Sequence, residues 1–156
     1  MTPEDLMQTA IAVARRGMAA GQSPFGCAVA LDNCLLAEAH NTVAADTDIT
    51  AHAEINGLRQ GCAALGNIFL EGAIVATTCE PCPMCMAALH WARVDTVYFG
   101  ASIDDAARAG FNELTLPATE LLTRGGSSVK LVGYVLQDEC VELFNAWLAN
   151  PERVPY

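Results

Sequence analysis

The stretch that decides the fold is HAEINGLRQGCAALGNIFLEGAIVATTCEPCPMC, residues 52–85. It begins with a histidine at 52 and a glutamate at 54, and it ends with cysteines at 82 and 85. A catalytic zinc ion in a protein takes three nitrogen, sulfur or oxygen ligands and leaves a fourth position open for water. We therefore predict one zinc ion per chain, held by His52, Cys82 and Cys85, with Glu54 left free to transfer protons.

The spacing of these residues predicts that two helices begin at the metal. Cys82 and Cys85 are three residues apart, so on a helix they share one face, close to the helix start that the prolines around them favour. The positive end of that helix favours thiolates, the form that binds metal. His52 and Glu54 are two apart and can meet one point only beyond a helix N-terminus, for which Thr50 is a candidate cap.

Two other interpretations compete with a catalytic site. Ordinary buried cysteines would explain a single C-x-x-C pair, but not the histidine and glutamate motif as well. A structural zinc site would need a fourth protein ligand, and Cys79 could supply it. We favour the catalytic site because Cys79 ends an extended run and because a purely structural site gives no reason for Glu54.

Composition limits the class of protein and its partners. The chain has 156 residues, of which 53 % are hydrophobic, and this suits one domain over residues 1–156. No apolar run is long enough to span a membrane, and the acidic N-terminus does not resemble a signal peptide. Seven cysteines without an export signal indicate a reducing, cytoplasmic setting, with those outside the motif as small buried hydrophobes.

The charge balance bears on nucleic acid binding. The chain carries eight basic and eighteen acidic residues, for a net charge of −10. Proteins that grip DNA or RNA need lysine and arginine against the phosphates. We therefore expect a small-molecule substrate, with no nucleic acid and no membrane as partner.

Helical and strand patterns alternate along the chain. We expect a helix from Thr2 to Gly21 and a polar loop over 42–50. Further helices are expected at 52–66, 83–93, 104–109, 117–124 and 138–149, and strands at 27–31, 34–39, 73–78, 96–99 and 129–136. Helices alternating with mostly buried strands predict an α/β fold, a mixed sheet with helices on both faces.

These residues resemble the cytidine deaminase-like superfamily of zinc deaminases, and within it the small bacterial guanine deaminases, over nearly the full chain. The stretches that carry the resemblance are Pro24-Phe25-Gly26, Asn41, residues 50–54, residues 78–85, Trp91-Ala92-Arg93, Asp105-Ala106-Ala107, Ala109-Gly110-Phe111 and Tyr156. The zinc motif is common to the superfamily, whereas Ala109-Gly110-Phe111, the acid after it and the final tyrosine point to guanine. The resemblance implies a three-layer α/β/α sandwich with a five-stranded mixed sheet.

The resemblance also implies an activity and roles for single residues. It implies hydrolysis of guanine to xanthine and ammonia, with Glu54 as proton shuttle and Glu113 as a second catalytic carboxylate. The implied substrate-binding residues are Phe25, Asn41, Ala53, Trp91 and Tyr156. It further implies a homodimer in which the tail, residues 150–156, exchanges between subunits so that Tyr156 covers the neighbouring site.

One departure from the family pattern leaves two alternative substrates open. Family members often have two acids after the phenylalanine, whereas this chain has Phe111-Asn112-Glu113, so substrate preference could differ. Cytosine, ammeline or guanosine could replace guanine as substrate. A tRNA adenosine deaminase carries the same zinc motif but needs a basic face and a pocket open to a flipped base.

Overall fold

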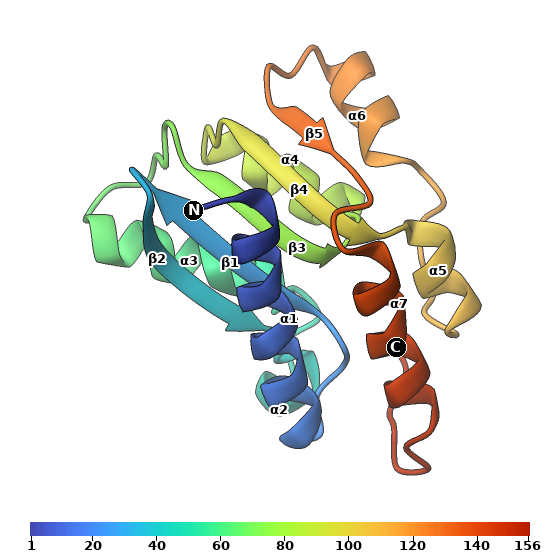
Figure 1. Cartoon of the computed structure of the whole chain (residues 1–156). Helices are drawn as coiled ribbons and strands as arrows, with labels where there is room; N and C mark the ends of the chain where they lie inside the picture. Colours follow the sequence, from blue (N-terminus) through green and yellow to red (C-terminus); the bar gives the residue numbers. More distant parts are fainter.

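The computed structural model describes residues 1–156 and contains a five-stranded sheet in the order β2-β1-β3-β4-β5 (Figure 1). The strands are β1 (Gly26–Leu31), β2 (Cys34–His40), β3 (Ile74–Cys79), β4 (Thr96–Ala101) and β5 (Lys130–Val132). β1 is antiparallel to both β2 and β3, whereas β3, β4 and β5 are parallel. The predicted α/β fold with a five-stranded mixed sheet is therefore confirmed.

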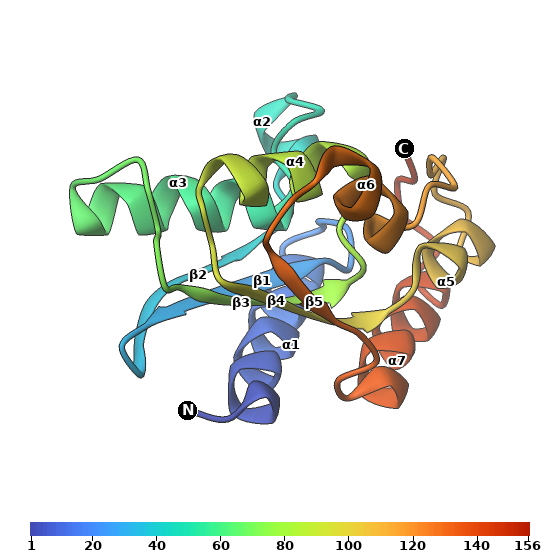
Figure 2. The same cartoon turned by 90° about the horizontal axis from the view of Figure 1, so that it is seen from above.

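Helices cover both faces of this sheet, which gives the expected three layers (Figure 2). The helices are α1 (Pro3–Ala19), α2 (Val43–Asp46), α3 (Ala53–Leu65), α4 (Pro83–Trp91), α5 (Ile103–Arg108), α6 (Ala118–Gly125) and α7 (Gln137–Leu148). One face of the sheet is covered by α1 and α7, and the other by α3, α4 and α6. No helix combines the length and the apolar character that crossing a bilayer requires.

Alternation along β1 explains how the strand serves two cores. Ala28 and Ala30 pack in the cluster under α1 and α7, whereas Cys27 and Val29 pack in the cluster under α3 and α4. Successive side chains of a strand point to opposite faces, so a central strand needs apolar residues at every position. Close approach of α1 depends on Gly26, where a Cβ atom would lie 2.1 Å from the Ala10 carbonyl oxygen.

The sheet register brings segments that are distant in sequence to the same end of the strands. Thr77 of β3 pairs with Cys27 of β1, and Gly26 pairs with His40 of β2. Because β1 runs opposite to its two neighbours, the residue before β1 and the residues after β2 and β3 all lie at that end of the strands. Ligands of open α/β sheets bind beyond the carboxyl ends of the parallel strands, so a site is expected there.

Several local predictions were wrong. The expected loop over 42–50 contains the short helix α2, and the last strand has only three residues because the chain turns after it, with positive φ at Tyr134 and Leu136. Thr50 does not cap α3: its hydroxyl donates to Asp48, and His52 is the N-cap. Outside the motif, Cys27 and Cys140 are buried as expected, but Cys34 is exposed and Cys62 is only partly buried.

Candidate active site

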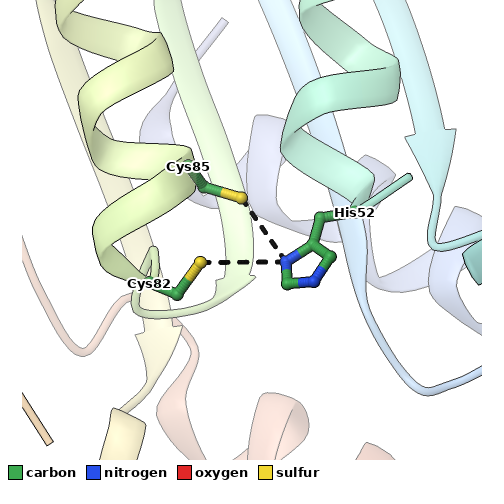
Figure 3. A group of neighbouring side chains, drawn as sticks. All are labelled: His52, Cys82 and Cys85. Atoms are coloured by element: carbon green, nitrogen blue, oxygen red, sulfur yellow. Dashed lines mark hydrogen bonds between the residues drawn. The ribbon is translucent and has the colours of Figure 1, made fainter. Parts of the chain in front are cut away.

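The three predicted metal ligands converge from two helix starts. His52 is the N-cap of α3, Cys82 is the N-cap of α4, and Cys85 lies in the first turn of α4. The Nδ1 atom of His52 lies 3.8 Å from Sγ of Cys82 and 3.5 Å from Sγ of Cys85 (Figure 3). Both helix N-termini therefore direct their ligands to one point.

The spacing of these atoms fits a zinc ion. Zinc–nitrogen and zinc–sulfur bonds of about 2.05 and 2.3 Å at a tetrahedral angle place nitrogen and sulfur about 3.6 Å apart. The measured separations bracket that value, and all three donor atoms lie within 4.8 Å of one another. Hydrogen bonding from the Cys85 thiol lowers the pKa of Cys82 to about 4, so a thiolate is already favoured there. The residues present thus suit zinc.

The competing fourth ligand is engaged elsewhere. Cys79, the last residue of β3, is buried, and its thiol lies 3.5 Å from the Ser102 carbonyl oxygen, to which it donates. The cluster that can hold a metal contains only His52, Cys82 and Cys85. Three protein ligands and one free position are typical of a catalytic zinc site.

Glu54 lies in the first turn of α3, beside the ligand cluster. It is 6 % exposed, and the Thr77 hydroxyl donates to its Oε1 at 2.9 Å. Burial raises the pKa of this carboxyl group above its ordinary value. A carboxylate whose pKa is raised towards neutrality both accepts and releases protons readily.

Glu113 reaches the same cavity from a different part of the chain. It lies between α5 and α6, and it lines the cavity with His52, Glu54 and Cys82. Burial raises its pKa to about 7, and the negative charge expected on Cys82 adds to the effect. Two carboxyl groups with raised pKa values therefore face one cavity.

The remaining wall carries the predicted binding residues Phe25, Asn41 and Tyr156. The buried Asn41 amide is oriented by two contacts: its Oδ1 accepts the Val43 N–H at 3.1 Å, and its Nδ2 donates to the Tyr156 hydroxyl. The Tyr156 ring lies 5.9 Å from the His52 ring and 5.6 Å from Phe111. With Tyr156 in place the open space is about 20 Å³, room for roughly one water molecule.

Comparison with known proteins agrees with this geometry. Residues 1–101 match the family model described as the cytidine and deoxycytidylate deaminase zinc-binding region. The chain belongs to this zinc-dependent deaminase family. The family's zinc site and the geometry above identify His52, Cys82 and Cys85 as the zinc-binding triad of an aminohydrolase.

Individual relatives of this deaminase differ in substrate. Guanine deaminase of Bacillus subtilis is 41 % identical over 114 residues, which cover 72 % of this chain and 73 % of the relative. The tRNA-specific adenosine deaminase of the same organism is 34 % identical over 148 residues, or 94 % of this chain and 89 % of the relative. A solved structure in complex with 2,6-diaminopurine superimposes with a TM-score of 0.89 at 28 % identity. The superposition covers 99 % of this chain and 85 % of the chain in that structure.

Two predicted binding residues do not line the cavity of the deaminase. Trp91 ends α4 and is 77 % exposed, in an open apolar groove of about 830 Å³ on the outer side of α3 and α4. Trp91 does not line the cavity in this structure, and its predicted packing against the substrate stays a prediction. The side chain of Ala53 is fully buried in the core under α3, so only its backbone, at the helix start, is near the site.

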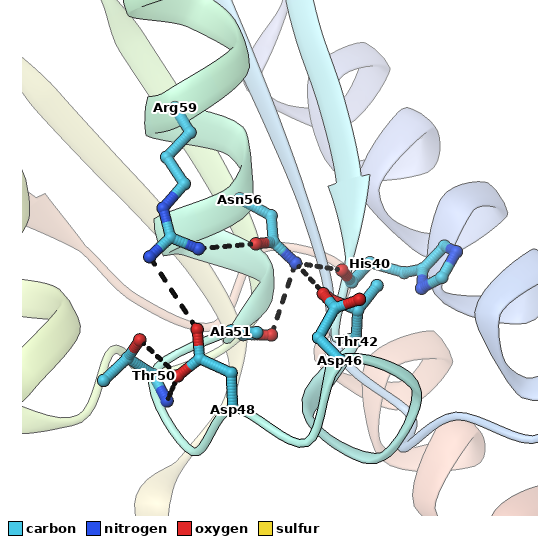
Figure 4. Close-up of polar contacts among 8 residues, drawn as sticks. All are labelled: His40, Thr42, Asp46, Asp48, Thr50, Ala51, Asn56 and Arg59. Carbon is cyan, nitrogen blue, oxygen red and sulfur yellow. Dashed lines mark hydrogen bonds and ion pairs between the residues drawn. The ribbon is translucent and has the colours of Figure 1, made fainter.

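Sequence reasoning also missed a residue that braces the loop between Asn41 and His52. The Asn56 side-chain amide donates to the carbonyl oxygens of His40 and Ala51, at 3.1 and 3.3 Å, and to the Thr42 hydroxyl at 2.8 Å (Figure 4). These contacts join the end of β2 to the residue before His52. Asn56 lies four residues after His52 on α3, and no motif distinguishes it from a surface asparagine.

Proposed function

We propose that this deaminase hydrolyses guanine to xanthine and ammonia. The observation that carries the proposal is one small cavity in which two glutamates with raised pKa values and the Asn41 amide lie beside two of the zinc ligands, His52 and Cys82. Guanine deaminase is among the relatives, and a purine occupies a structural neighbour. A purine is larger than the space left, so Tyr156 shifts outward as the base enters and covers it afterwards.

The chain's own residues account for the proton transfers. A zinc ion, when bound, supplies Lewis-acid activation of the attacking water. Glu54 accepts a proton from that water and delivers it to N3 of the ring as C2 becomes tetrahedral. Glu113 donates a proton to the amino group on C2, which leaves as ammonia when the C2–N bond breaks. Glu54 takes the proton of the C2 hydroxyl group as the C2 carbonyl of xanthine forms. Exchange with solvent then returns Glu54 to the carboxylate and Glu113 to the carboxylic acid. Asn41 hydrogen-bonds the base, and Phe25 packs against it.

Ammonia release from a panel of amines tests the substrate assignment. Guanine, cytosine, adenine, guanosine and ammeline are supplied separately, and guanine is expected to react fastest. Asn112, where family members often have an acid, is exposed and does not line the cavity, so it gives no reason to expect a different base. Slow release from guanine with fast release from another compound would reassign the substrate.

The relative that acts on tRNA supports a second candidate, a tRNA adenosine deaminase. A flipped adenosine needs a pocket open to solvent and a basic surface for the backbone. This chain closes its cavity with Tyr156 and carries a net charge of −10. Inosine formed in tRNA, together with tight binding at physiological salt, would favour this candidate over guanine.

Glu113 is expected to give the pH profile of kcat/KM an alkaline limb. As the donor to the leaving amino group it must be protonated, and its pKa in the free protein is about 7, so kcat/KM falls as pH rises through that value. Measuring kcat/KM from pH 5 to 9 checks this, with Glu113→Gln as the comparison. That variant is slower at low pH and loses the limb, whereas an unchanged limb would assign the titration to another group.

The tail of this structure lies on its own chain, because Tyr156 reaches Asn41 and the Asn112 N–H donates to the Tyr156 carbonyl oxygen at 3.2 Å. A homodimer with exchanged tails nevertheless stays a prediction, and co-expression tests it. One copy carries Glu54→Ala, and the other lacks residues 150–156. If tails are exchanged, hybrid dimers contain one complete site and regain activity. If each tail serves its own chain, the hybrids stay inactive.

A further inference from the structure

A third glutamate, Glu80, lines the cavity but makes contacts of a different kind. Its Oε1 accepts the backbone N–H of Ala118 at 2.8 Å, and its Oε2 accepts the backbone N–H of Ile103 at 3.2 Å. Its own N–H donates to the Ala101 carbonyl oxygen at 2.7 Å. Both carboxylate oxygens therefore already accept hydrogen bonds from the protein, which sets Glu80 apart from Glu54 and Glu113.

The two amides that Glu80 joins flank the segment that carries Glu113. Ile103 is the first residue of α5, and Ala118 is the first residue of α6. The residues between these helices, 109–117, form neither helix nor strand. One carboxylate thus holds the start of α5 and the far end of the Glu113 segment at a fixed separation.

We propose that Glu80 is the positioning residue that fixes Glu113 in the cavity. Glu80 directly follows β3, the central strand of the sheet, of which all residues but the first are buried, so the segment is tied to the core of the fold. Between α5 and α6 the backbone contacts of the segment are short-range or made to the tail, such as that of Asn112 with Tyr156. The inference rests on the proposed role of Glu113 but not on the identity of the base.

Glu80→Gln is the informative substitution. Glutamine keeps the size of glutamate and one acceptor, but its NH2 group then faces a backbone N–H that has no other acceptor. We expect kcat to fall about 10- to 100-fold, because a misplacement of roughly 1 Å has effects of that order. Zinc content should be unchanged, KM should change less than kcat, and the Ile103 and Ala118 amides should exchange hydrogen faster.

A double-mutant cycle separates positioning from a general structural effect. Glu80→Gln, Glu113→Gln and the double variant are compared on whichever base the enzyme deaminates fastest. If Glu80 acts through Glu113, adding Glu80→Gln to Glu113→Gln causes little further loss of kcat. Glu120→Gln is the matched control, since this residue lies on α6 and pairs with Arg124 at the surface. It should leave kcat unchanged.

Equal losses of kcat from Glu80→Gln in both backgrounds would overturn the positioning role and leave the proposed function intact. An active Glu113→Gln single variant would instead remove the catalytic role of Glu113. If Glu80→Gln folds poorly, Glu80→Asp replaces it, because aspartate keeps the charge but is too short to span both amides. The same non-additivity with Glu113→Gln is then expected, and additive losses would contradict the inference.

Discussion

Replacing Cys82 with alanine is expected to abolish zinc binding and deamination together. Cys82 is one of only three protein ligands, and its thiolate is the one favoured before metal binds, with a pKa of about 4. Removing it leaves His52 and Cys85, too few to hold zinc in a site that already keeps one position for water. Zinc content, about one equivalent per chain before the change, should fall to near zero, and turnover should fall to the background rate.

Metal analysis of the purified variant measures the first effect, and ammonia release measures the second. Cys34→Ala is the matched control, because Cys34 is exposed at the start of β2, whereas the site lies beyond the other end of that strand. A chelator should make the unaltered protein behave like Cys82→Ala, including the loss of the thermal stability that bound metal adds. If Cys82→Ala keeps zinc and activity while Cys79→Ala loses both, Cys79 is the ligand and the ligand assignment is wrong.

The metal ligands could be predicted from sequence because their geometry is local. A residue at a helix start points beyond the helix end, so His52 and Cys82 as N-caps needed only the two helices to converge. The order of the strands in the sheet brings these two helix starts together. The alternation of helices with strands, and the resemblance to zinc deaminases, predicted the layers in the same way.

The supporting residues could not be predicted because their partners are distant in sequence. Glu80 binds amides 23 and 38 residues away, and nothing around it in the chain specifies that contact. Trp91 lies outside the cavity for a geometric reason. It lies six residues after Cys85 on the same helix, which places it about 9 Å further along the axis, at the end away from the metal.

Glu54→Gln is expected to keep zinc and lose most turnover. The substitution preserves the size of the side chain. In the unaltered protein the Thr77 hydroxyl donates to Oε1 of Glu54 at 2.9 Å, and the amide oxygen of glutamine can accept the same hydrogen bond. Because the zinc triad is untouched, metal content and the folded structure should not change. An amide cannot carry a proton between water and the ring, and loss of such a positioned group lowers kcat by about 10²- to 10⁴-fold.

Zinc content, kcat and KM of Glu54→Gln are compared with those of Glu120→Gln, the same change at a surface position on α6. The loss should appear in kcat rather than KM, because proton transfer stabilises the transition state and not the bound base. Thr77→Val, which removes the hydroxyl that orients the carboxylate, should give a smaller loss in the same direction. Near-normal turnover by Glu54→Gln would show that the base lies elsewhere, and Glu113, the other carboxyl group with a raised pKa in the cavity, would take its place.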